Sequence, residues 1–190
     1  NAVAVQADGR IVIGGSFTDK GAGGGSLLAR YFPNGMVDTS FLPSPDGAVS
    51  AILIQPDGKI LVGGAFLSLG GVQRRYVARL NPDGSIDSGF NPKANGQVNA
   101  FALLSDGKIV IGGAFTSLDP NSTDDSDVDV TSRAYLARLN ADGTIDTAFN
   151  PGTSAAVRAL LLQSDGRLLV GGGFATVGDQ TRNGLARFNA

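Results

Sequence analysis

Arginine and aspartate are the side chains in this sequence that recur with a spacing suited to chemistry. An arginine ends each of four Ala-Arg pairs, and an aspartate follows the first three of them eight positions later. A guanidinium and a carboxylate at a fixed spacing can form an ion pair or hold a charged ligand. Because the pair recurs, we predict that it is structural and ties one strand to the next or to the neighbouring repeat. The residues are Arg30, Arg79, Arg138 and Arg187, with Asp38, Asp87 and Asp146.

A ten-residue insertion in the third repeat carries the other candidate chemistry. Asp125, Asp127 and Asp129 alternate, so their carboxylates point the same way in an extended segment and could bind Ca²⁺ through oxygen. The glycine and the distal glutamate of an EF-hand loop are missing, so a solvated acidic loop is the competing interpretation. Calcium is the one cofactor that these residues suggest; otherwise we expect none. Asn121 begins an Asn-Ser-Thr glycosylation sequon.

Catalytic patterns are missing from the sequence. It contains no histidine and no cysteine, which removes the commonest general base and the thiolate nucleophile. We find no nucleophile elbow, phosphate-binding loop or dinucleotide fingerprint. A glycosidase would need two carboxylates facing each other across a cleft, and outside the insertion no aspartate departs from the repeat. We therefore predict that the chain is not an enzyme, and a hydrolase is the least favoured class.

The composition favours strands and tight turns. All 17 acidic residues are aspartate, which is a better turn former than glutamate. The formal net charge of −2 gives no basic surface for nucleic acid. No apolar run approaches the ~20 residues of a membrane-spanning helix, so we expect no insertion into a membrane.

The repeat has a period of 49 residues. The turn pair Asp-Gly recurs at Asp8, Asp57, Asp106 and Asp165, in steps of 49, 49 and 59. The longer step reflects the insertion. The sequence predicts a single repeat domain over 1–190, with units at 1–47, 48–96, 97–155 and 156–190, the last of them incomplete.

Each unit reads as four short strands. In the second unit they are expected at 51–54, 59–66, 76–81 and 85–90. Asp-Gly at Asp57 and again at Asp83 favours hairpins, because glycine adopts positive φ without a Cβ clash. The Gly-Gly pair at Gly63 suits a bulge or a close approach between sheets. A unit is therefore predicted to be an antiparallel β-meander.

The first two strands of each unit are apolar on both faces, so neighbouring sheets must cover them. We predict an all-β fold of four-stranded antiparallel β-meanders packed as β-propeller blades. An open linear stack of the same sheets is the alternative. The recurring phenylalanines are expected in the core: Phe17, Phe66, Phe115, Phe174, Phe41, Phe90 and Phe149.

The repeated pattern DGKI, two apolar residues, GG and F, then ARLN, DGS and FNP, resembles the bacterial delta-60 repeat. That family is a β-propeller-type repeat of large surface or secreted proteins. The resemblance covers essentially the whole chain and implies a scaffold located outside the cell or on its surface. It implies no catalytic residue.

The last unit stops after its third predicted strand, at Arg187-Phe188-Asn189-Ala190. An open sheet edge favours association. The expected partners are therefore other copies of the chain or neighbouring repeats of a longer chain, with a surface glycan as a further possibility.

Together these observations predict a non-enzymatic structural or adhesive module of a bacterial extracellular protein, within a larger or filamentous assembly. The alternative is a glycan- or peptide-binding propeller that acts through loop 119–130, with or without calcium.

Overall fold

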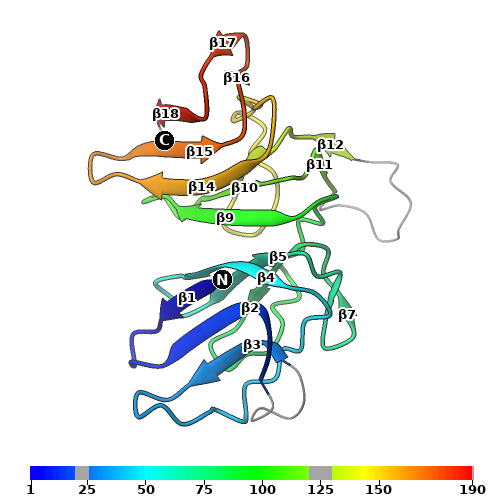
Figure 1. Ribbon diagram of the computed structural model, residues 1–190, viewed down its shortest axis with the longest axis vertical. Coiled ribbons are helices and arrows are strands. Elements are labelled where there is room, and N and C mark those ends of the chain that lie inside the picture. Colours follow the sequence, from blue (N-terminus) through cyan, green and yellow to red (C-terminus); the bar gives the residue numbers. More distant parts are fainter. Residues whose placement is uncertain (20–25, 120–129, 190) are drawn as a thin grey trace.

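The computed structural model describes residues 1–19, 26–119 and 130–189, which form a row of antiparallel β-sheets without a helix (Figure 1). Each predicted unit supplies one three-stranded sheet. The strands are, unit by unit, β1 (Ala2–Val5), β2 (Ile11–Asp19) and β3 (Ser26–Tyr31); β4 (Val49–Ile54), β5 (Ile60–Gly64) and β8 (Val77–Leu80); β9 (Val98–Leu103), β10 (Ile109–Gly113) and β13 (Leu136–Leu139); and β14 (Val157–Leu162), β15 (Arg167–Gly172) and β18 (Leu185–Asn189).

The predicted Asp-Gly turns join the first two strands of each sheet. Gly58 has φ +83°, a conformation that glycine adopts without strain. The Asp57 carboxylate accepts a hydrogen bond from the backbone N–H of Lys59 at 3.1 Å, which closes the turn. The turn therefore fixes which residues of β4 and β5 face each other.

In the first three units the fourth predicted strand is reduced to one bridge. Ile86 pairs with Leu80, and Val37 and Ile145 make the equivalent bridges. The chain then bends, because Asp87 Oδ1 accepts a hydrogen bond from the N–H of Gly89 at 3.1 Å. This local turn competes with continued sheet pairing, so the regular sheet stops at three strands.

Between the second and third strands of the last three units lies a two-stranded hairpin that the sequence did not predict. The hairpins are β6 (Ser68–Leu69) with β7 (Val72–Gln73), β11 (Ser117–Leu118) with β12 (Thr131–Ser132), and β16 (Thr176–Val177) with β17 (Gln180–Thr181).

A polar side chain just before the first strand holds each hairpin. Asp46 Oδ1 accepts hydrogen bonds from the backbone N–H groups of Leu67 and Ser68. Asn95 and Ser154 do the same in the next two units. Asp46 thus contacts the second unit, although the sequence boundary assigns it to the first.

Consecutive sheets pack face to face, with their first strands β1, β4, β9 and β14 side by side in a row (Figure 1). Three buried apolar clusters fill the junctions between sheets one and two, two and three, and three and four. Phe41, Phe66, Phe90, Phe115 and Phe174 are fully buried side chains of this core.

Glycine lets the sheets approach closely at each junction. A Cβ on Gly63 would lie 2.9 Å from Val98 and 3.0 Å from Phe101, both on the first strand of the next sheet. Val49 and Ile52 lie in the same way over Gly14, as Val157 and Leu160 do over Gly112. The row of described sheets does not close on itself, so the first and last sheets each keep one uncovered face (Figure 1).

Candidate functional site

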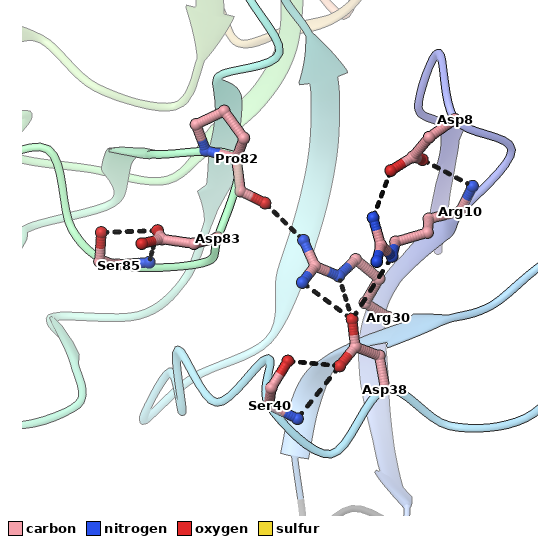
Figure 2. A network of polar contacts seen from close by, with 8 residues as sticks. All are labelled: Asp8, Arg10, Arg30, Asp38, Ser40, Pro82, Asp83 and Ser85. Carbon is pink, nitrogen blue, oxygen red and sulfur yellow. Dashed lines mark hydrogen bonds and ion pairs between the residues drawn. The ribbon is translucent and has the colours of Figure 1, made fainter.

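The repeated arginines and aspartates meet at the junctions between sheets. Arg30, at the end of β3, donates from Nε to Asp38 Oδ2 at 2.8 Å, and both side chains are buried (Figure 2). Arg79 makes the same 2.8 Å contact with Asp87, and Arg138 with Asp146. The structure therefore places each predicted arginine beside its predicted aspartate in the first three units.

A second cation, which the sequence reading missed, approaches each of these aspartates. Lys59 Nζ lies 2.9 Å from Asp87, and Lys108 Nζ lies 2.8 Å from Asp146. In the first unit Arg10 Nε lies 3.7 Å from Asp38. The signal was present, since a basic residue is the first after each of these Asp-Gly turns.

The surrounding cations hold the aspartates ionised. Lys108 donates a hydrogen bond that lowers the pKa of Asp146 to about 2, and Arg138 adds to the effect. Burial raises the pKa of Asp87, but hydrogen bonds from Lys59 and Arg79 outweigh it, and the pKa falls below its usual value. The carboxylates are therefore charged at neutral pH and paired with two cations.

Two of the arginines, Arg30 and Arg79, also reach the following sheet. Arg30 Nη1 donates to the backbone carbonyl of Pro82, in the second turn of the next unit, at 2.5 Å (Figure 2). Arg79 donates in the same way to the carbonyl of Ala141. The residue equivalent to Ala141 in the fourth unit is Ala190, which lies outside the described residues.

An aromatic ring completes the junction. The Arg30 guanidinium lies 4.4 Å from the centre of the Phe41 ring, within the range of a cation–π contact. The Phe41 ring also packs on the next unit's turn, where a Cβ on Gly84 would lie 2.5 Å from it. Arg79 with Phe90, and Phe90 with Gly143, repeat the arrangement. We call each set of arginine, aspartate and phenylalanine a junction triad.

The Asp38 carboxylate shows how fully the first triad is engaged within the protein. Asp38 Oδ1 accepts hydrogen bonds from both the N–H and the hydroxyl of Ser40, while Oδ2 accepts from Arg30 (Figure 2). Both carboxylate oxygens are thus engaged within the protein. The contacts of Asp38 therefore connect the third strand of the first unit to the turn that follows it.

The remaining predicted residues have other positions. Arg187 is exposed, and no ion pair in the described part of the chain includes it. Asp125, Asp127, Asp129 and the sequon residue Asn121 lie outside the described residues. Among the residues that the structure describes, no three His, Cys, Asp or Glu side chains gather closely enough to hold a metal ion.

A repeated blade-like sheet with these triads defines a β-propeller-type repeat protein. The chain belongs to the family described as the domain of unknown function (DUF5122) beta-propeller, whose model matches residues 6–41, 55–90, 104–149 and 163–190. A comparison with curated proteins gives no match.

Solved structures share the fold at low sequence identity. The extracellular domain of the candidate one-component system BT4673 from B. thetaiotaomicron is 14% identical, with a TM-score of 0.57 over 98% of this chain and 21% of that one. A streptogramin B lyase is 15% identical, with a TM-score of 0.56 over 100% of this chain and 54% of that one. Virginiamycin B lyase from Staphylococcus aureus is 16% identical, with a TM-score of 0.53 over 100% and 55%.

The chain thus spans about a fifth of the first of these proteins and about half of the two lyases. In the described part of the chain, no helix is long and apolar enough to cross a membrane.

Proposed function

We propose that this chain is a non-enzymatic structural or adhesive module of a bacterial extracellular or surface protein, and part of a larger assembly. The junction triads carry the proposal. Their charged and aromatic side chains, the most regular chemistry in the sequence, are used to join one sheet to the next. A protein whose polar residues are repeated and engaged in this way is suited to bear load or to display loops.

The comparisons support the location. The extracellular domain of BT4673 has the same type of fold. The resemblance to the delta-60 repeat, a family of surface and secreted proteins, supports the same proposal. The lyase names describe those two proteins, and at 15% and 16% identity their likeness to this chain concerns the fold.

Light scattering on the particle isolated from the producing bacterium tests this function. We expect a mass well above the 19.3 kDa of this chain, with further repeats of the same type in the particle. A native particle with the mass of one chain, or a turnover that an Asp→Asn change abolishes without loss of stability, would contradict the proposal. Repeating the measurement with a chelator tests whether calcium holds the particle together.

A second candidate function is recognition of a glycan or peptide by loop 119–130. The loop joins β11 to β12, where the second unit has the tight turn Gly70-Gly71. The hairpin registers are equivalent: Leu118 pairs with Thr131 as Leu69 pairs with Val72. The insertion therefore extends the tip of a hairpin whose base is unchanged, which is where binding loops are carried on rigid scaffolds.

Replacing residues 119–130 by Gly-Gly, the turn of the second unit, tests the loop. We expect the variant to keep its thermal stability and to lose any binding seen on a glycan array. Binding that survives this replacement would exclude the loop as the recognition surface. The array should be run with and without calcium, because Asp125, Asp127 and Asp129 are the residues proposed to hold it.

A further inference from the structure

Three asparagines of this chain are each followed by a glycine: Asn34, Asn95 and Asn183. In such a pair the backbone nitrogen of the glycine can attack the side-chain amide of the asparagine, which forms a cyclic imide and releases ammonia. Glycine favours the attack because it has no Cβ to obstruct the approach and its backbone rotates freely. Each pair is therefore a candidate site of deamidation, and the surrounding structure determines which of them reacts.

The first pair, Asn34-Gly35, lies in an exposed turn after β3. One hydrogen bond holds the Asn34 side chain, from the Met36 backbone N–H to Oδ1 at 3.0 Å, and none of the described hydrogen bonds involves its Nδ2. The Gly35 N–H donates to the carbonyl of Phe32 at 2.9 Å. Both hydrogen bonds lie within the turn, so a local opening at the surface frees the side chain and the attacking nitrogen together.

The exposure of Asn34 is a property of the turn and does not depend on what precedes β1. Asp83 and Asp142 occupy the same place in the second and third units, where a phenylalanine of the preceding sheet covers the turn glycine. Both aspartates are nevertheless exposed. Asn34 would therefore stay in contact with water if a further sheet packed against its turn.

The second pair, Asn95-Gly96, is held by a distant part of the chain. Asn95 Oδ1 accepts from the N–H groups of Thr116 and Ser117 at 2.7 and 3.0 Å, and Nδ2 donates to Thr116 Oγ1 at 2.9 Å. A Cβ on Gly96 would lie 2.9 Å from the carbonyl oxygen of Ala114, so this glycine is packed against backbone. Asn95 is exposed like Asn34, but its side chain can rotate only when hairpin β11–β12 is released.

We propose that Asn34 is a site of spontaneous deamidation in the folded protein, whereas Asn95 is protected from it. The Gly35 nitrogen loses its proton and bonds to Cγ of Asn34, the Cγ–Nδ2 bond breaks, and Nδ2 leaves as ammonia. Water then opens the cyclic imide. Attack of water at Cγ gives aspartate, and attack at the backbone carbonyl gives isoaspartate.

Aspartate fits this turn. Asp83, in the equivalent position of the second unit, accepts from the N–H of Ser85 at 2.9 Å, which is the contact that Asn34 makes with Met36. Deamidation to aspartate therefore keeps the turn and adds one negative charge to the chain.

Isoaspartate does not fit in the same way, because it routes the chain through the side chain and adds one carbon atom to the backbone of the turn. The bridge between Tyr31 and Val37 closes this turn, and Asp38 follows directly. The Asp38 N–H donates to the carbonyl of Arg30 at 2.8 Å, which places its carboxylate beside the Arg30 guanidinium. The longer backbone should therefore weaken the first junction triad.

Peptide mapping by mass spectrometry tests the site. The purified chain is incubated at mildly alkaline pH, folded or in urea, and conversion at each asparagine is followed with time. In urea we expect the three pairs to react at similar rates. In the folded chain Asn95 should react at least about tenfold more slowly than Asn34, because several hydrogen bonds must open together to release it.

Two variants serve as controls, and circular dichroism establishes that each is folded. Thr116→Val removes the Oγ1 acceptor, so conversion of Asn95 should rise about threefold while that of Asn34 stays unchanged. Asn34→Asp fixes the first product and should melt like the wild type. The isoaspartate form, separated by chromatography from an aged sample, should melt at a lower temperature than Asn34→Asp.

Equal rates at Asn34 and Asn95 in the folded chain would overturn the proposal. It would also be overturned if Asn34 stayed intact in the folded chain over the time in which it is converted in urea. An isoaspartate form that melts with Asn34→Asp would overturn the link between this reaction and the first junction triad.

Discussion

At the scale of single residues, Asp38, Asp87 and Asp146 form the centre of each junction triad. Each accepts from an arginine of its own unit and has a second cation nearby, from the residue that precedes the second strand. Burying such a carboxylate without partners would be strongly unfavourable, so its value to the fold depends on all of its partners being present.

Replacing Asp38 by Asn should therefore be strongly destabilising. The amide can retain the oxygen that accepts from Ser40, but its NH₂ group cannot accept from Arg30, whose charge stays buried. Removing one partner of a buried pair reduces the free energy of unfolding by about 3–5 kcal/mol. Urea denaturation followed by circular dichroism measures the change.

The matched control is Asp165→Asn. Its pair with Arg167 is half exposed on both sides (48% and 49%), and Asn keeps the oxygen that accepts from the Arg167 N–H. Here the change should stay within about 1 kcal/mol. Equal effects at the two positions would mean that burial of the Asp38 pair does not determine its contribution.

Stability should fall in acid. The pKa of Asp146 is about 2 in the folded protein, mainly through the hydrogen bond from Lys108, and hydrogen bonds lower the pKa values of Asp38 and Asp87 as well. A lowered pKa stabilises the fold above the unfolded-state value of 3.8, and the stabilisation is lost as the pH falls through the folded value.

Melting temperatures measured between about pH 5 and pH 2 should therefore decrease steadily. Asp146→Asn should melt lower at pH 7 and show a shallower decrease, because one of the titrating groups is gone. An identical slope in wild type and variant would show that Asp146 does not contribute to the acid sensitivity.

At the scale of elements, two turn glycines in equivalent positions allow the destabilisation caused by backbone strain to be measured separately from that caused by packing. Gly35 and Gly84 have φ of +83° and +96°, so Ala at either position adds about 1–2 kcal/mol of strain. Only Gly84 lies against Phe41 of the preceding sheet. Gly84→Ala should therefore be more destabilising than Gly35→Ala by about 1–3 kcal/mol, measured by thermal unfolding of the monomer. Equal losses would mean that the Phe41 ring moves aside freely.

The regular strands could be predicted from the sequence because each rests on a strong local signal. The Asp57-Gly58 turn and the apolar runs on either side of it specify β4 and β5 without reference to the rest of the chain. The spacing of Arg79 and Asp87 likewise indicated a contact across one short turn. Lys59 was missed because its partner Asp87 is 28 residues away, although the recurrence of a basic residue after each turn could have revealed it.

The short hairpins could not be predicted in the same way. Two residues per strand, as in β6 and β7, are too few for an alternating pattern. The side chain that holds this hairpin, Asp46, lies more than twenty positions earlier and reads as an ordinary turn residue. The fourth strand was predicted over several residues, but the structure forms only a single bridge there. The turn that Asp87 makes with Gly89 competes with sheet pairing and ends the strand.

At the scale of the whole molecule, stability is built between neighbours, as in other repeat proteins. The second and third sheets are covered on both faces, whereas the first and the last each have one exposed face. Opening an end sheet breaks fewer apolar contacts than opening an inner sheet, so it requires less free energy.

Amide hydrogen exchange in the dilute monomer should therefore be slowest in β5 and β10 and faster in β2 and β15. Uniform protection along the monomer would indicate that the four units open together.

The unchanged base of hairpin β11–β12 has a consequence for how such a protein can diversify. Ten residues have been added at its tip, yet Ser117 and Leu118 pair as Ser68 and Leu69 do in the second unit. Lengthening an exposed loop has only a small entropic effect, which grows with the logarithm of its length. The hairpin tips can therefore change in sequence and length while packing constrains the sheets. Each hairpin tip is a separate position at which a new sequence can be inserted, by evolution or by design.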